Sequence, residues 1–310
     1  MEIQTENRMK DVISFLRKGD PLSAQNIISS LFENDLESEE LIYTNKCCVF
    51  WMDSIKRLNS IEDAFERCEK ALLEWKSFQA FISKEKQEYS PALFAVQEGF
   101  FSSVLANCEK LLNEKDPLQR AEIHRKAGIC YKKLGNFVKA RDFLTEANNI
   151  SPNLSSVLAE LADCYSLCGE DRIGKVLFRE AFFIDPESID LDFLDSELIK
   201  CLISKTREHG FSGKELQFWI PVYGTLTGIL NIKRELSSTE VGRLKTSIYA
   251  MENEYKDPGC NSKILTPRML NGYFWLIDHY VSTNQNSAVI NEVLLKIKIL
   301  DSSVYEAYIK

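Results

Sequence analysis

The residues of this chain that could bind metal or carry out redox chemistry are cysteines placed close together in the sequence. Cys164 and Cys168 lie four positions apart, which puts both thiols on one face of a helix, as a metal site requires. No histidine or further cysteine follows at ligand spacing, so core packing is favoured and no metal is predicted. Cys47 and Cys48 are adjacent, and adjacent residues on a helix point in different directions, which makes them weak redox candidates.

Catalysis would need an acid, a base and a nucleophile that the sequence brings together. His124, His209 and His279 stand far apart, and none belongs to an HExxH or similar motif. The aspartates between residues 190 and 195 lack the turn glycine and the terminal glutamate of an EF-hand calcium loop. The sequence also carries no glycine-rich phosphate-binding motif. We therefore expect no enzyme and no cofactor.

The composition of the chain argues against several other classes of protein. Of its 310 residues, 45% are hydrophobic and 27% are charged, which is ordinary for a globular protein. A net charge of −8 and a pI near 5.2 disfavour nonspecific binding of nucleic acid. No stretch reaches the roughly 18 apolar residues that a membrane span needs. The N-terminus lacks the features of a secretory signal, so the nine cysteines predict reduced thiols in the cytoplasm.

Two consecutive stretches, 121–154 and 155–188, repeat the same structural residues 34 positions apart. Small residues at helical spacing let two helices approach closely, and larger residues fill the gaps between them. A glycine then predicts the turn that ends the first helix, and a proline starts the next unit. The recurring pairs are Gly128 and Ala162, Tyr131 and Tyr165, Gly135 and Gly169, Ala147 and Ala181, and Pro152 and Pro186.

This pattern resembles the tetratricopeptide repeat family, whose thirty-four-residue units read W-x2-L-G-x2-Y, then A-x3-F, then P. The resemblance implies an all-α fold, a right-handed superhelical solenoid of antiparallel helix hairpins. The first helix of each hairpin would line the concave wall, where the family binds its ligands. The first copy supplies His124, Ala127, Gly128, Tyr131, Ala140, Leu144 and Pro152, and the second supplies Leu158, Leu161, Ala162, Tyr165, Gly174, Phe178 and Pro186.

Weaker patterns extend the predicted repeats over residues 1–188. One hairpin is predicted over residues 8–32 with its turn at Gly19, and another over residues 39–78 with its turn at Asn59. Residues 99–117 resemble the second helix and exit turn of a further unit. Pro91 would start or shorten the helix before it.

The repeat pattern fades after Pro186, over residues 189–205 and the loop REHGFSG, which we interpret as a junction. Residues 189–310 are predicted to hold degenerate helical repeats that continue the solenoid or form a second helical subdomain. Their predicted helices cover 214–236, 238–256, 267–282 and 287–300.

The resemblance places charged side chains on the concave wall of the first clear repeat. A basic strip on an acidic chain would attract an acidic peptide, although such residues are often only solvated. In the next unit, an aspartate at the corresponding wall position would repel a carboxylate and disfavours a carboxylate clamp. The predicted groove residues are Glu122, Arg125, Lys126, Ile129, Lys132, Lys133 and Asp163.

A second predicted surface is apolar and lies in the N-terminal units. Its residues would accept an amphipathic helix if they faced the groove, although residues at this spacing more often belong to a core. They are Met9, Ile13, Leu16, Tyr43 and Phe50.

Aromatic residues concentrate in the C-terminal half, over residues 211–223 and 273–280, and predict a core there. The last segment carries Val304, Tyr305 and Tyr308 at helical spacing. It could fold back as a cap, dock on another subunit, or precede further chain.

The sequence thus predicts a cytoplasmic, non-catalytic scaffold that binds a peptide or helix of a partner protein in its concave groove. One alternative is an assembly element that self-associates through its C-terminal helices. Another is a helical regulatory domain of a larger protein. Neither nucleic acid nor a membrane is expected as a partner.

Overall fold

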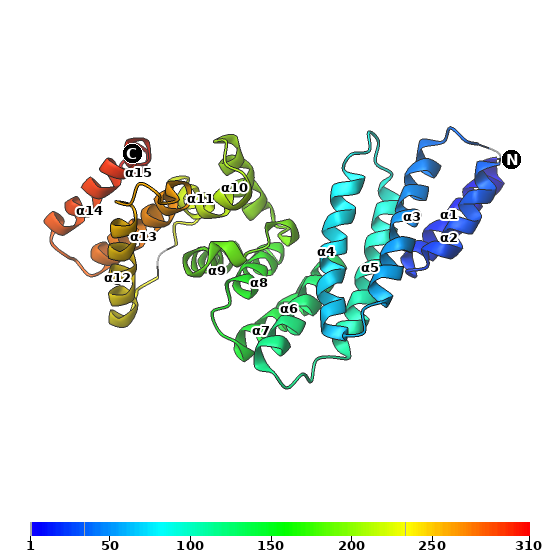
Figure 1. The fold of residues 1–310 in the computed structure, drawn as a ribbon, viewed down its shortest axis with the longest axis horizontal. Coiled ribbons are helices and arrows are strands. Elements are labelled where there is room, and N and C mark those ends of the chain that lie inside the picture. Colours follow the sequence, from blue (N-terminus) through cyan, green and yellow to red (C-terminus); the bar gives the residue numbers. More distant parts are fainter. Residues whose placement is uncertain (1, 34, 233) are drawn as a thin grey trace. The chain divides into compact units, whose positions relative to one another are not determined.

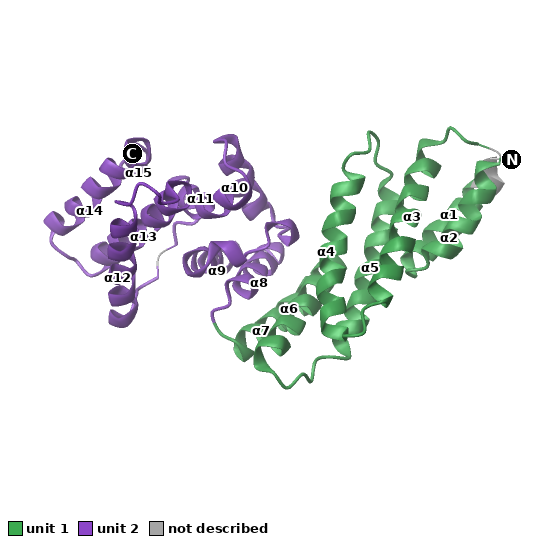
Figure 2. Cartoon of the chain, viewed as in Figure 1, with its two compact units in different colours: residues 1–152 green, residues 153–310 purple. Residues whose placement is uncertain are grey.

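The computed structural model describes residues 2–33, 35–232 and 234–310, and in these ranges the chain is all-α (Figure 1). Helix accounts for 77% of the structure, in fifteen α-helices and two short 3-10 helices, and the described residues form no strand. The predicted all-α class is therefore confirmed. The chain divides into two compact units, residues 1–152 and 153–310 (Figure 2). The predicted boundary at residue 188 marks the fading of the repeat pattern, and as a domain boundary it stays a prediction.

Unit 1 consists of seven helices joined by short turns. Most of them begin with a polar side chain that accepts a hydrogen bond from the first turn: Asp20, Ser38, Asp63, Asp116 and Asn136. The helices are α1 Glu2–Arg17, α2 Pro21–Phe32, α3 Glu39–Asn59, α4 Ala64–Ile82, α5 Ser90–Glu109, α6 Pro117–Lys133 and α7 Phe137–Ile150.

The core of unit 1 is an aromatic cluster between the long helices α3, α4 and α5, which lie side by side (Figure 1). The ring of Trp51 lies 4.5 Å from that of Phe100, and the ring of Trp75 lies 4.8 Å from that of Phe101. Gly99 lets the turn after α1 approach α5, because a Cβ atom at this position would lie 2.1 Å from the carbonyl oxygen of Leu16.

Unit 2 begins with a pair of helices of 13 and 14 residues, and its longest helix has 21 residues. Its elements are α8 Ser155–Leu167, α9 Asp171–Ile184, η1 Pro186–Ser188, η2 Leu191–Phe193, α10 Glu197–Glu208, α11 Gly213–Leu226, α12 Ser238–Glu254, α13 Ser262–Ser282, α14 Ser287–Leu300 and α15 Ser302–Tyr308. One apolar cluster joins α8 and α9 to α10 and α11, and a second surrounds α13. Core packing is thus continuous across residue 188.

Four helix hairpins, two in each unit, turn in the same way. In each, a residue with positive φ ends the first helix: Gly19 (71°), Gly135 (79°), Gly169 (81°) and Asn284 (52°). The next N–H donates to the carbonyl five residues earlier, which is the Schellman arrangement. These bonds are Asp20 to Phe15 at 3.0 Å, Asn136 to Tyr131 at 2.9 Å, Glu170 to Tyr165 at 2.8 Å and Gln285 to Tyr280 at 2.9 Å.

The same four hairpins also bury equivalent positions. The residue nine positions after each turn is buried in every case: Ile28, Leu144, Phe178 and Val293. An aromatic residue always lies four positions before the turn, and it supplies the accepting carbonyl: Phe15, Tyr131, Tyr165 and Tyr280. Backbone geometry and core positions therefore recur together, even where the sequences have diverged.

Several helix boundaries differ from those predicted. The helix α5 runs without a break through Gly99, so the separate second helix expected over residues 99–117 does not exist, although α5 does start beside Pro91. Part of the stretch interpreted as a junction, residues 197–208, forms α10. The helix α11 ends at Leu226, ten residues before its predicted end at residue 236. Gly228, whose φ is 70°, follows the end of α11 and turns the chain there.

Candidate functional site

Lys126, one of the predicted groove residues, lies inside unit 1. Its side chain is only 2% exposed. The ammonium lies 3.4 Å from the carboxylate of Glu69 and 4.4 Å from the centre of the Phe65 ring, both on α4. A buried ammonium needs such partners because desolvation alone would be unfavourable. Lys126 therefore joins α6 to α4 and offers little surface to a ligand.

Glu122 and Arg125 form an ion pair on the same helix. The guanidinium Nη2 of Arg125 lies 2.8 Å from the carboxylate of Glu122, and the ammonium of Lys126 lies 3.7 Å from it. Burial would raise the pKa of Glu122, but these two cations outweigh it and hold the pKa below its usual value. The predicted basic strip is thus largely neutralised by its own glutamates.

The remaining predicted groove residues of α6 differ in exposure. Ile129 is completely buried and Lys132 is 2% exposed, whereas Lys133 is half-buried. The structure brings Glu122, Arg125 and Lys126 into one charged cluster, but Ile129 offers no accessible surface. Partner contact through Arg125, Lys132 and Lys133 stays a prediction.

Asp163, the predicted wall residue of the next repeat, has a clear structural role within unit 2. Its side chain is completely buried. Its two carboxylate oxygens accept hydrogen bonds of 2.8 Å from the backbone N–H groups of Asp195 and Ser196, just before α10. The carboxylate therefore anchors the start of α10 to α8.

The predicted apolar surface of the N-terminal units is mostly core. Leu16 and Tyr43 are each 3% exposed, while Met9, Ile13 and Phe50 are half-buried. Phe50 packs on Phe78 and Phe81 of α4 at ring distances of 5.3 and 5.4 Å. These contacts agree with the interpretation of the residues as core, and the structure does not gather the five into one exposed surface.

Unit 1 contains a cavity of about 270 Å³ between the α1–α2 turn and helices α3, α4 and α5. Leu16, Trp51, Phe100 and Val104 supply much of its apolar wall. Arg67 also lines it, but two backbone carbonyls already hold that guanidinium: Ile61 at 2.6 Å and Glu62 at 3.3 Å. The cavity is therefore mainly apolar, which sequence analysis did not predict because α1 and α5 are distant in the chain.

Unit 2 contains a larger hollow of about 510 Å³, lined by α9, the segment after it, α11, α12 and α13. We call this hollow the unit-2 groove. Buried apolar residues form its floor: Phe182, Phe218, Leu244, Met251 and Pro267. Its polar lining includes Arg243, Ser247, Arg268 and Asn271 together with four acidic residues: Glu180, Asp185, Glu187 and Glu240.

Each acidic residue of the unit-2 groove has a partner inside the unit. Arg234 binds Glu180 at 2.7 and 2.9 Å and Glu240 at 2.8 Å. Lys214 pairs with Glu187, and the carboxylate of Asp185 accepts from the backbone N–H of Glu187 at 3.1 Å.

Hydrogen bonds from Arg234 and Ser237 lower the pKa of Glu240 to about 2. Its carboxylate therefore stays ionised and paired with Arg234 at neutral pH.

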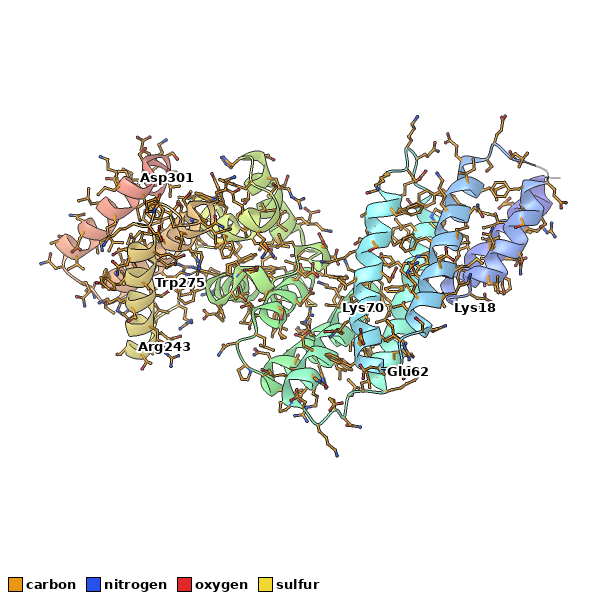
Figure 3. The ribbon with its side chains drawn as sticks, viewed as in Figure 1. Lys18, Glu62, Lys70, Arg243, Trp275 and Asp301 are labelled. Atoms are coloured by element: carbon orange, nitrogen blue, oxygen red, sulfur yellow. The ribbon has the colours of Figure 1, made fainter. Side chains whose placement is uncertain are left out.

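A buried cation–aromatic cluster supports the groove. Arg179 forms an ion pair with Asp278, and both side chains are less than a tenth exposed. Its guanidinium lies 4.5 Å from the Trp275 ring, and that of Arg234 lies 5.7 Å from the same ring. Figure 3 marks Trp275 on α13 and Arg243 on α12. The cluster therefore ties α9 and Arg234 to α13.

The last helix folds back within unit 2, one of the three outcomes left open by the sequence. Val304 is 3% exposed, and the Tyr308 ring stacks on Phe274 at 4.5 Å. Burial, followed by the charge of Asp278, raises the pKa of Tyr308 to about 12. The predicted C-terminal aromatic core is confirmed by the burial of Trp219, Tyr273 and Phe274.

The buried cysteines resemble small apolar residues rather than reactive thiols. Burial raises the pKa of Cys47, and it raises that of Cys48 to about 12. Cys130 and Cys164 each precede a repeat tyrosine and are completely buried, which for Cys164 agrees with the core packing that the sequence favoured. Across the described ranges, no group of three or more His, Cys, Asp or Glu side chains is placed to hold a metal ion.

None of the helices in the described parts of the chain is both long and apolar enough to cross a membrane. In comparisons with known proteins, no family model and no curated sequence matches the chain.

Proposed function

We propose that this chain is a non-catalytic scaffold of tetratricopeptide-like hairpins that binds a segment of another protein. The observation that carries the proposal is the hairpin turn that recurs four times with equivalent buried positions. Repeated hairpins of this kind expose long concave surfaces because each packs only against its neighbours. In this proposal the hairpins stack as a right-handed solenoid in the cytoplasm.

The unit-2 groove supports binding rather than catalysis. It combines a buried apolar floor with a few polar side chains, which suits a peptide whose apolar residues enter the groove. Its ionisable side chains are arginines and carboxylates. Two of these carboxylates, Glu180 and Glu240, bind Arg234 and so hold parts of the unit together.

A peptide-display selection on the full chain tests this function. We expect enrichment of related peptides that bind with one-to-one stoichiometry in calorimetry, while a scrambled sequence of the same composition does not bind. If no enriched peptide gives saturable binding to the folded chain, the proposed function is wrong.

Self-association is a second candidate function, favoured by one observation on α14. Leu295 and Ile299 lie four positions apart on this helix and are 56% and 78% exposed. Such a pair can pack against a second copy. Light scattering at rising concentration would show an increase in mass, and Leu295→Ser with Ile299→Ser would abolish it. Tyr308 is a poorer contact than the sequence suggested, because it packs on Phe274.

A further inference from the structure

The unit-2 groove differs from the α6 strip in the state of its cations. On α6, Glu122 neutralises Arg125, and Glu69 neutralises Lys126. In the unit-2 groove, the described residues provide no ion-pair partner for Arg243 or Arg268, and both side chains are exposed. The lining acids are already bound to Arg234, Lys214 or the backbone. Positive charge is thus available at Arg243 and Arg268 and not at Arg125 or Lys126.

The two arginines stand on different helices at the edge of one apolar hollow. Arg243 belongs to α12 and Arg268 to α13, and Gly272 brings these helices together, because a Cβ atom there would lie 3.2 Å from Ile248. Guanidinium groups bind carboxylates through paired hydrogen bonds. Asn271, which is 8% exposed, adds an amide to the lining of the same hollow.

We propose that the unit-2 groove binds an acidic peptide segment, with carboxylates on Arg243 and Arg268 and apolar side chains on the floor around Phe218 and Met251. This inference rests on the proposed function and names the chemistry of its partner. Charge complementarity favours the acidic peptide, since the described residues offer Arg243 and Arg268 no ion-pair partner, whereas Lys214 and Arg234 already hold Glu187, Glu180 and Glu240.

Fluorescence anisotropy with a labelled peptide that alternates Asp with Leu and Phe tests the proposal on the full chain. We expect saturable binding that weakens as salt rises. Reversing both charges with Arg243→Glu and Arg268→Glu should weaken it about tenfold or more. The matched control is Arg207→Glu, an exposed arginine of α10 outside the groove, which should leave the affinity within about twofold.

Two further comparisons separate the parts of the proposal. Ser247→Trp places a bulky side chain in the groove without changing its charge, and we expect it to reduce binding. The peptide with Asn in place of Asp should bind at least about tenfold more weakly than the acidic one. Circular dichroism of each variant shows whether the fold is retained.

The results that overturn the proposal are distinct from those that overturn the function. Equal binding by the charge-reversed and unmodified chains removes the assignment to Arg243 and Arg268. Binding of a phosphoserine peptide but not of its aspartate form would also overturn it, in favour of a phosphate ligand. If display-selected peptides bind the charge-reversed chain as tightly as the unmodified chain, the scaffold function stands and only this site is wrong.

Discussion

The hairpins α6–α7 and α8–α9 share one turn geometry and one set of buried small residues, but they bury different charges. Lys126 and Glu160 occupy the same repeat position and are each 2% exposed. Three positions later, Ile129 in the first hairpin corresponds to Asp163 in the second. The repeated residues therefore set the backbone of the hairpin, whereas the positions between them are adapted to local neighbours. Such positions are poor guides to a shared binding surface.

The second helices of these hairpins differ in the same way. Arg179 on α9 is buried and paired with Asp278, whereas Thr145, its counterpart on α7, is exposed. The difference comes from α13, whose Trp275 packs against Arg179 and Phe183 of α9.

Arg179→Leu should give the largest difference between the two hairpins. We expect a loss of about 3–5 kcal/mol in the free energy of unfolding, because the buried carboxylate of Asp278 loses the guanidinium of Arg179. Thr145→Leu, the matched change in α7, should stay within about 0.5 kcal/mol. Urea unfolding followed by tryptophan fluorescence measures both. If Arg179→Leu with Asp278→Leu is no more stable than Arg179→Leu alone, the ion-pair explanation is wrong.

The next largest effect should come from Asp163→Asn. The backbone N–H groups of Asp195 and Ser196 lose a charged acceptor in a buried place, so we expect a loss of about 2–4 kcal/mol. The matched change Ile129→Val should cost about 1 kcal/mol. Hydrogen exchange tests the cause, because Asp163→Asn should increase exchange at residues 195–200 first. Unchanged protection there would contradict the anchoring role.

The turn glycines should behave alike in the two hairpins, which sharpens the comparison. Gly135 and Gly169 have φ near +80° and open space around them, so Gly→Ala at either should cost about 1 kcal/mol through backbone strain alone. Gly242→Ala is the control, since this helical glycine also has open space and the change should stabilise α12 by about 0.5–1 kcal/mol. Thermal unfolding of the three variants measures these shifts, and unequal effects at Gly135 and Gly169 would show that the turns are not equivalent.

These contrasts explain how much of the molecule the sequence could predict. The hairpins around Gly135 and Gly169 were predictable because a glycine, a tyrosine and small residues specify each turn locally. The role of Gly99 was not, since its neighbour is a turn more than seventy residues earlier in the chain. The hairpin at Asn284 was only suspected, because an asparagine supplies the positive φ there.

The candidate site was harder to predict than the fold. The resemblance grouped Arg125 and Lys126 as a basic strip, but the pairing of Lys126 with Glu69 depends on how α4 packs. The unit-2 groove draws on four helices, and no local pattern brings Arg243 and Arg268 together. A signal for it existed only in the aromatic residues of α11, such as Phe218, which sequence analysis assigned to a core.

The smallest expected effect concerns Glu240, which helps to hold Arg234 against α9. Its pKa is about 2 in the folded chain, below the ordinary value of 4.5, because Arg234 and Ser237 donate to the carboxylate. A lowered pKa means that its contribution to stability is complete above about pH 4.5 and is lost as the pH falls towards 2. Glu240→Gln should therefore flatten the fall in unfolding free energy over this range. The control is Glu146→Gln in α7, at the repeat position of Glu180. It should leave the change of unfolding free energy with pH as it is in the unmodified chain. If the unfolding free energy depends on pH equally in the unmodified chain and in Glu240→Gln, Glu180 alone holds Arg234. The two hairpins would then differ through the one carboxylate of Glu180 rather than through a network that includes Glu240.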